Sequence, residues 1–307
     1  MKIIIAGGTG FVGRHLIPAL LKENHEVSLI TRDVNKGKKI FPQNVQIITW
    51  DNLKTLDPNQ MDAVINLAGE NIGEKFWTKT RKEKIKQSRI HATKTLAEWC
   101  ARATKKPHLY NTSAIGVYGL QTTSSTLPPA LNEETMIPWG NPSDFLSEVG
   151  QAWEIATRVA ESQGVPVTIT RFAVVLHKNE GVLKKLSFSF KLGLGGPIGS
   201  GQQAFTWVHI DDLVRAFIFL LNHPELTGAF NICAPECVTQ KEFARVFAKS
   251  LHRPAILTTP AWALKLIFGQ MADELLLAGQ HVYPKRLLES GFQFSHPKLE
   301  EALMPIK

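Results

Sequence analysis

Short apolar segments recur along the chain as far as Thr170, and longer stretches with helical spacing of apolar residues separate them. These segments are rich in residues that favour strands, and they cover Ile3–Ile5, Glu26–Thr31, Val45–Trp50, Ala63–Leu67, His108–Thr112 and Val165–Thr170. Alternating strands and helices predict βαβ units and a parallel sheet. The segments are nearly continuous apolar runs, which indicates that helices cover both faces of the sheet. The pattern therefore predicts a doubly wound α/β domain.

Beyond Arg171 the pattern changes. A glycine-rich stretch, Leu192–Gly201, precedes a predicted helix from Asp211 with one apolar face, formed by Leu213, Phe217, Leu220 and Leu221. Prolines then separate short helices, which predicts a smaller C-terminal α/β lobe. We predict a first domain over residues 1–171, to which 207–232 returns, and a lobe built from 172–206 and 233–307. The glycine-rich stretch suits either a flap over a cleft or a plain connection between the lobes.

The composition is that of an ordinary globular protein, with 44% apolar and 20% charged residues. The three cysteines, Cys100, Cys233 and Cys237, form no paired framework, so a disulfide scaffold is not expected and a reducing cytoplasm is the simpler prediction. The N-terminal apolar run is too short for a signal peptide, and no later run is long enough to cross a membrane. We therefore predict a cytoplasmic protein that does not bind membranes.

The net charge of +8 suits nucleic acid, a membrane surface or an anionic small molecule. Much of the excess lies in Lys75–Arg89, a segment that is predicted to be helical. No nucleic-acid-binding motif accompanies it, so an anionic cofactor and substrate are favoured over nucleic acid.

The glycines after the first predicted strand provide the strongest functional signal. In the segment Gly7-Gly8-Thr9-Gly10-Phe11-Val12-Gly13, Gly8, Gly10 and Gly13 match the pattern G-x-G-x-x-G, with a helix and a second strand following. The early glycines let the backbone turn towards a pyrophosphate, and the free N–H groups of the helix N-terminus bind it. The sequence therefore predicts a Rossmann-type dinucleotide site formed by Gly7, Thr9, Gly10, Phe11, Val12 and Gly13.

Two charged positions bear on which dinucleotide binds. At the end of the second strand, where NAD enzymes place an acidic ribose ligand, the chain has Thr31 and then Arg32. A guanidinium suits a 2′-phosphate, so NADP(H) is favoured, although the neighbouring Asp33 keeps NAD open. Asp51, after the third strand, is placed either to meet the adenine or to begin a turn.

Further motifs follow in the order found in extended short-chain dehydrogenase/reductases, which the chain resembles over nearly its whole length. These are Asn66-Leu67-Ala68-Gly69-Glu70, Thr112–Gly119 and Trp207–Asp212. More narrowly, Gly69–Ile72, Ser88-Arg89, Arg171–Leu176, Leu192–Gly201 and Leu276–Arg286 resemble the atypical YfcH-like nucleoside-diphosphate-sugar epimerases. The resemblance implies an NADP(H) site that includes Thr31, Arg32, Leu67, Ala68, Gly69, Glu70, Arg89 and Val174.

The catalytic pair of that family has no counterpart in this sequence. The family's reaction uses a Tyr-x-x-x-Lys pair, in which the tyrosine exchanges a proton with the substrate and the lysine lowers the tyrosine's pKa, while the nicotinamide carries the hydride. Leu146 and Gly150 occupy the two positions here, and Ala114 stands where the family has a catalytic hydroxyl. Ser113 and Tyr118 are the remaining candidates for catalysis, and Ser113 suits a satisfied hydroxyl at a strand end equally well.

Two classes of function stay open from the sequence. The first is an NAD(P)-dependent oxidoreductase or epimerase that acts on a small molecule, for which a sugar nucleotide is one candidate. The second is a non-catalytic NADP(H)-binding protein that senses redox state or serves as a scaffold. His209, Asp211 and Asp212 suggest a metal site only weakly, because Asp211 is better explained as a helix N-cap, so no metal is predicted. The sequence indicates no oligomeric state.

Overall fold

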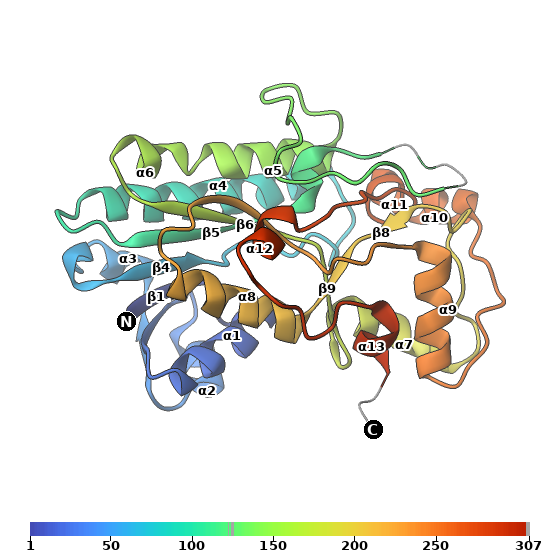
Figure 1. The fold of residues 1–307 in the computed structure, drawn as a ribbon, viewed down its shortest axis with the longest axis horizontal. Coiled ribbons are helices and arrows are strands. Elements are labelled where there is room, and N and C mark those ends of the chain that lie inside the picture. The colour runs from blue at the N-terminus through green and yellow to red at the C-terminus, as the bar shows by residue number, and fades with distance from the viewer. Residues whose placement is uncertain (122, 124–125, 305–307) are drawn as a thin grey trace.

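The structure is a computed structural model that describes residues 1–121, 123 and 126–304 (Figure 1). Within these residues the main sheet has seven parallel strands in the order β10-β6-β5-β4-β1-β2-β3. The strands are β1 Lys2–Ala6, β2 Glu26–Ile30, β3 Val45–Ile48, β4 Ala63–Asn66, β5 His108–Ala114, β6 Val167–Phe172 and β10 Gly228–Ile232. All six predicted strands are present, and β10 is an addition. The order reverses between β1 and β4, where open α/β sheets bind ligands.

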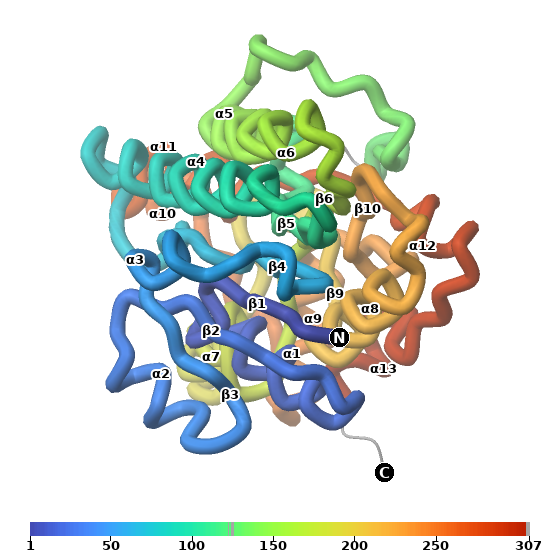
Figure 2. Tube along the Cα trace, turned by 90° about the vertical axis from the view of Figure 1, so that its left-hand side faces the viewer, coloured from blue at the N-terminus to red at the C-terminus, as the bar shows by residue number. Residues whose placement is uncertain are grey.

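Helices cover both faces of this sheet, which confirms the predicted Rossmann-type, doubly wound α/β class (Figure 2). One face carries α1 Phe11–Lys22, α2 Val34–Ile40 and α8 Ile210–Asn222, and the other carries α4 Lys79–Ala101, α5 Phe145–Ile155 and α6 Arg158–Ser162. Alternate residues of β1 serve the two cores: Ile3 and Ile5 pack with α1 and α8, whereas Ile4 and Ala6 pack with α4. Three short elements lie in the connections: α3 Trp50–Leu53 and the 3₁₀ helices η1 Pro58–Gln60 and η2 Ile115–Tyr118.

A second group of elements lies beyond the carboxyl ends of the strands (Figure 1). It comprises β7 Val174–His177, α7 Gly181–Lys191, β8 Ala204–Phe205, β9 Trp207–His209, β11 Val238–Thr239, α9 Gln240–Ser250, α10 Ala261–Phe268, α11 Gln270–Leu275 and α13 Leu299–Leu303. Its own core includes Leu183, Trp207, Phe243 and Phe247. The short helix α12 Lys285–Glu289 instead packs against β10 of the main sheet. The carboxyl ends of the strands therefore face the second group.

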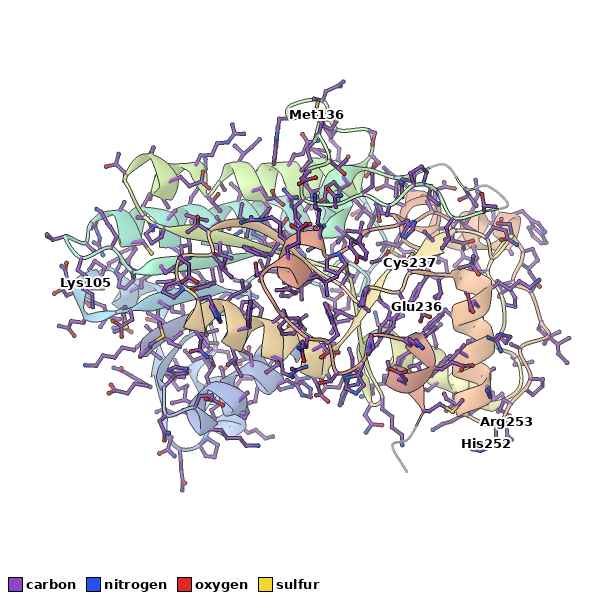
Figure 3. The ribbon with its side chains drawn as sticks, in the orientation of Figure 1. Lys105, Met136, Glu236, Cys237, His252 and Arg253 are labelled. Carbon is purple, nitrogen blue, oxygen red and sulfur yellow. The ribbon has the colours of Figure 1, made fainter. Side chains whose placement is uncertain are left out.

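Labelled side chains mark the long axis of the molecule in Figure 3. Lys105, just before β5, lies at the end of the sheet away from the second group, and His252 and Arg253, after α9, lie at the opposite end. Cys237 lies between them, and its thiol accepts a hydrogen bond from Thr206 Oγ1 at 3.3 Å. The three cysteines are free thiols, as the sequence predicts. Among the described residues, no helix is both long enough and apolar enough to cross a membrane.

Two helix starts differ from the sequence predictions. Helix α8 begins at Ile210, and its N-cap is His209, whose Nδ1 accepts the Asp211 N–H at 3.3 Å. The prediction that Asp211 caps this helix is therefore wrong, because Asp211 lies in the first turn. Helix α4 begins at Lys79 after the cap Thr78, so Lys75 and its next neighbours precede the helix.

The glycine-rich stretch 192–201 is anchored on the second group. Gly199 N–H donates to Thr259 O, and Thr259 N–H donates back to Pro197 O, both at 2.9 Å. A Cβ at Gly196 would lie 2.3 Å from Leu257 O, so this close approach needs glycine. These contacts favour the connecting role over the flap.

Candidate functional site

The turn after β1 has the shape that a pyrophosphate-binding loop requires. Gly7 has φ +78°, and a Cβ there would lie 2.6 Å from the Leu67 carbonyl carbon. A Cβ at Gly13 would lie 2.3 Å from Gly8 Cα, so Gly13 lets α1 approach the loop closely. Phe11, Val12 and Gly13 form the first turn of α1, whose N–H groups have no partner within the helix. The backbone thus offers a concave site with free donors.

The cavity over this loop brings together much of the predicted cofactor set. It has a volume of about 480 Å³. Of the predicted residues, its lining includes Gly7, Thr9, Gly10, Thr31, Arg32, Leu67, Ala68, Gly69 and Glu70. Ile30, Trp50, Ser88, His91 and Ala92 complete the lining. Phe11, Val12 and Gly13 lie just outside it, in the first turn of α1.

Positive charge gathers at one end of this cofactor cavity, around Glu70. The Glu70 carboxylate lies 2.8 Å from Arg81 Nη1 and 3.8 Å from both Arg32 Nη2 and Lys84 Nζ. The hydrogen bond from Arg81, together with the charges of Lys84 and Arg32, holds the Glu70 pKa below its ordinary value. Three cations against one carboxylate leave this corner positive. The Arg32 side chain is 81% exposed and is free to turn towards a ligand.

Neither of the two acidic residues that the sequence offers for an adenosine lines this cavity. The Asp33 carboxylate accepts the Lys36 N–H at 2.9 Å as the N-cap of α2. The Asp51 side chain is 95% exposed and lies 3.8 Å from Lys54 Nζ. Trp50, its neighbour, lines the cavity instead. Asp51, which the sequence leaves either to meet the adenine or to begin a turn, thus lies in α3 with its side chain exposed to solvent.

A second cavity adjoins the first, and it contains the positions at which the family has its catalytic groups. Its volume is about 250 Å³. Ala114, Leu146 and Gly150 all line it, so the expected hydroxyl, phenol and amine are replaced there by apolar groups and a glycine. The remaining lining is Ile72, Arg89, Ile115, Gly116, Val149, Trp153, Phe172, Ala173, Val174, Ala204, Phe205, Thr206, Glu274, Leu275, Ala278, Gly279 and Gln280. We call this space the apolar pocket.

Arg89 lies between the two cavities. Its guanidinium carbon is 3.1 Å from where a Cβ of Gly69 would stand, and it lies 4.8 Å from the centre of the Trp153 ring. Its Nη1 donates to Glu70 O and Ile85 O, each at 3.0 Å. Burial lowers the Arg89 pKa to about 10, and the Glu70 carboxylate opposes this effect. The neighbouring residues along α4 carry no carboxylate, but the fold brings Glu70 close.

Ser113 and Tyr118 belong to a buried hydrogen-bond network and line neither cavity. The Ser113 hydroxyl, 1% exposed, donates to Glu154 Oε1 at 2.7 Å. Arg171 donates to the same carboxylate from Nε at 2.9 Å and from Nη2 at 2.8 Å. Its Nη1 donates to the Tyr118 hydroxyl at 2.8 Å, which donates in turn to Asn231 Oδ1 at 3.0 Å.

This network explains why both hydroxyls are poorly placed for proton transfer. Ser113 is held by an ionised pair, and burial raises the pKa of Tyr118 to about 12. Ser113 is paired with Arg171 across β5 and β6 and so lies on the opposite face from Ala114, as its one-residue offset implies. Neither Glu154 nor Arg171 was a sequence candidate. The signal that points to them is their position, one on the expected motif helix and one at the end of the last predicted strand.

The packing of η2 on α5 excludes a lysine at the family's position. A Cβ at Gly150 would lie 2.8 Å from Val117 Cα and 3.0 Å from Val117 N. Backbone atoms cannot yield as the end of a flexible side chain can, so any larger residue requires η2 to move. Gly116 makes the same approach from the other side, since its Cβ would lie 3.2 Å from Leu146 Cβ. At Gly150 this fold therefore has no room for the lysine of the family's pair unless η2 moves.

Comparisons with known proteins agree with this geometry. Residues 3–233 match the model of the NAD dependent epimerase/dehydratase family, and residues 259–306 match a domain of unknown function, DUF1731. Epimerase family protein SA0724 of Staphylococcus aureus is 35% identical, over 98% of this chain and 97% of its own. Epimerase family protein ML0860 of Mycobacterium leprae is 34% identical, over 98% of this chain and 94% of its own.

Solved structures show the same likeness. The human epimerase family protein SDR39U1, crystallised with NADPH, superposes with a TM-score of 0.87 at 34% identity, over 99% of this chain and 98% of its own. The nucleoside-diphosphate sugar epimerase of Corynebacterium glutamicum has a TM-score of 0.77 at 28% identity, over 99% of this chain and 57% of its own. The expected resemblance is confirmed: the chain belongs to the NAD dependent epimerase/dehydratase family, as an extended short-chain dehydrogenase/reductase with a C-terminal DUF1731 domain.

Proposed function

We propose that this protein is an NADP(H)-dependent oxidoreductase that acts on a small molecule bound in the apolar pocket. The observation that carries the proposal is the juxtaposition of a cavity over the glycine-rich turn, with positive charge at one end, and a mostly apolar pocket across Arg89. The residues fit the cofactor: the Gly7 turn leaves no room for a Cβ, and the first turn of α1 offers free N–H groups. When bound, NADPH supplies a hydride. The NADPH in the SDR39U1 structure supports the same choice of cofactor.

The preference for NADP(H) rests on Arg32 and Lys84. Both cations lie close to Glu70 at the open end of the cavity, where a 2′-phosphate would meet them. The Asp33 carboxylate is bound to the α2 N-terminus, which leaves it poorly placed to accept from a ribose hydroxyl. Loss of one charge-assisted contact costs about 1–3 kcal/mol.

Calorimetric titration with NADPH and NADH tests this preference. We expect Arg32→Ala to weaken NADPH binding by about 1–3 kcal/mol and to leave NADH nearly unchanged. Lys38→Ala is the matched control, because it removes one exposed positive charge from the neighbouring α2. Equal affinity of the wild type for the two cofactors would refute the NADP(H) assignment.

Arg89 is the second cofactor contact that we propose. It is buried at the boundary of the two cavities, and among the described residues its Nη2 and Nε have no hydrogen-bond partner. These donors are available to a phosphate or to an oxygen in the apolar pocket. A crystal structure with NADPH is expected to place the Arg89 guanidinium within hydrogen-bond reach of the dinucleotide or of a bridging water; a guanidinium well beyond that reach would remove this assignment.

A non-catalytic NADP(H)-binding protein is the alternative, and one observation favours it. The family's tyrosine is replaced by Leu146, its lysine has no room at Gly150, and Ser113 and Tyr118 are hydrogen-bonded to the Glu154–Arg171 pair. General acid–base catalysis typically contributes about 10²–10⁴-fold, so hydride transfer without it is slow unless the substrate needs little help. Oxidation of NADPH with a panel of carbonyl compounds and sugar nucleotides separates the two functions. Turnover of any of them supports the oxidoreductase, and absence of turnover with the whole panel favours the binding protein.

A further inference from the structure

The apolar pocket carries very little charge for a site in a family that includes sugar-nucleotide enzymes. Of the described residues that line it, Arg89 is the one cation and Glu274 the one anion. The Glu274 carboxylate is already engaged, since it accepts Leu146 N–H at 3.0 Å, Phe145 N–H at 3.3 Å and Gln270 Nε2 at 2.6 Å. A diphosphate brought into this pocket would therefore lose its water and gain a single cation in return.

The unpaired polar groups of the residues that line the pocket are donors. Trp153 Nε1 and Gln280 Nε2 each expose less than 1 Å² and have no hydrogen-bond partner among the described residues, so each side chain must turn before its N–H reaches a ligand in the pocket. Their side chains line the pocket and are only 6% and 7% exposed. Arg89 adds Nη2 and Nε, which likewise donate to no described residue. A buried unpaired donor costs free energy in the empty protein, so a small rotation that brings it to a ligand oxygen is favoured.

The C-terminal segment lines one side of this pocket and limits its width. Residues Glu274, Leu275 and Ala278–Gln280 form one wall, and a Cβ at Gly279 would lie 2.0 Å from Ala204 O. Gln121 N–H donates to Gly279 O at 3.3 Å, so the segment is held from both sides. The volume of about 250 Å³ lies below the range of about 300–1,000 Å³ that is usual for drug-sized ligands. A nucleoside diphosphate sugar is larger than this space.

From apolar walls, unpaired donors and small volume, we propose that the pocket binds a compact, uncharged carbonyl compound with an apolar body, and excludes nucleoside diphosphate sugars. The inference rests on the proposed function, which supplies the hydride. The reaction balances as a two-electron reduction: a hydride bonds to the carbonyl carbon, the C=O π bond breaks, and the oxygen takes a proton from water to give an alcohol. Arg89, Trp153 and Gln280 would bind the oxygen and stabilise its growing negative charge.

The test compares three probes by calorimetry, on cofactor-free protein and on protein saturated with NADP⁺: 4-phenylbutan-2-one, n-butylbenzene and UDP-glucose. We expect the ketone to bind more tightly than the hydrocarbon of similar shape, and UDP-glucose to show no binding. Trp153→Phe and Gln280→Leu each remove one donor and keep an apolar side chain. Each is expected to weaken the ketone by about 3- to 10-fold and to leave n-butylbenzene unchanged. Gln163→Leu, an exposed position after α6, is the control for the substitution itself.

The outcomes separate this inference from the proposed function. If NADPH fails to bind while the ketone binds the free protein with the expected dependence on Trp153 and Gln280, the oxidoreductase proposal fails and the chemistry of the pocket stands. If NADPH binds but UDP-glucose binds more tightly than the ketone, or the ketone does not bind at all, the inference is overturned. If both substitutions instead weaken the binding of ketone and hydrocarbon equally, the inference is also overturned, because the donors would then not hydrogen-bond to the ketone oxygen.

Discussion

Replacing Gly150 by alanine tests whether the packing of η2 on α5 excludes the family's catalytic lysine. Gly150 lies inside α5 and has no positive φ, so its backbone conformation suits any residue. In an exposed helix, Gly→Ala stabilises by about 1 kcal/mol. Here the added Cβ would lie 2.8 Å from Val117 Cα, 2.9 Å from Val117 Cβ and 3.0 Å from Val117 N. Real Cβ atoms almost never come this close, so η2 or α5 must shift.

The expected net effect follows from these two opposing terms. Overpacking a core typically costs about 1–3 kcal/mol, and the upper part of that range applies because backbone atoms oppose the new methyl group. Subtracting the helix preference of about 1 kcal/mol leaves a net loss of about 1–2 kcal/mol for Gly150→Ala. Lysine adds the same Cβ and a longer side chain, so the double variant Leu146→Tyr/Gly150→Lys is expected to be less stable than Gly150→Ala. We also expect it not to gain dehydrogenase activity.

Urea unfolding followed by far-UV circular dichroism measures this loss, and Gly37→Ala provides the matched control. Gly37 is also buried within a helix, but its Cβ would meet only side-chain atoms, among them Ile47 Cγ2 at 3.3 Å, which can yield. The control keeps the same helix preference without a backbone contact, so it is expected to be as stable as the wild type or more stable by up to about 1 kcal/mol. A Gly150→Ala protein as stable as the wild type would refute the reasoning, since the lysine would then be absent for reasons other than space.

Three further predictions concern the buried polar groups. Burial lowers the His108 pKa from 6.5 to about 4, so the folded state favours the neutral ring. The free energy of unfolding is therefore unaffected by His108 above pH 6.5 and falls by about 3 kcal/mol in all as the pH drops towards 4. His108→Gln should flatten that part of a pH–stability curve. Glu154→Gln leaves the buried Arg171 guanidinium without its counter-charge and should lower the unfolding free energy by about 3–5 kcal/mol, whereas Glu154→Leu/Arg171→Met should cost less; equal losses would argue against a charge effect. Ser113→Ala and Tyr118→Phe should each cost about 1 kcal/mol of stability and change NADPH turnover little, so a rate loss of about 100-fold at unchanged stability would return that hydroxyl to the catalytic machinery.

The sequence predicts the fold around the glycine-rich turn well because the signals there lie close together along the chain. The strand pattern identifies β1 to β6, and the Gly7–Gly13 segment fixes the turn, the helix start and the free donors within a few residues. Arg32 follows from its distance along the same βαβ unit. Local spacing does not decide the direction of a side chain: Trp50 lines the cavity, whereas Asp51, the next residue of α3, is exposed to solvent.

The apolar pocket could not be predicted from the sequence because its walls come from distant segments. Leu146 and Gly150 mark the missing pair in the sequence, but nothing near them indicates that Glu274 binds the N-terminus of their helix. Two α5 N–H groups that need a partner at any helix start thereby find one on α11. Strand β10 likewise lies outside the predicted strands, although its Asn231 accepts from Tyr118 and completes the network that holds this hydroxyl.

These contacts connect the loss of the catalytic pair with the presence of the C-terminal domain. Without a tyrosine and a lysine side chain, the start of α5 has no polar group to present to a substrate, and η2 can pack directly on Gly150. The space this leaves is closed by α11 and the strand-like segment after it, which bring Glu274 to the helix N-terminus and Gln280 to the wall. Residues 259–306, which match DUF1731, thus supply one wall of the apolar pocket. We therefore expect substitutions at the contacts between α5 and α11 to change what the apolar pocket binds.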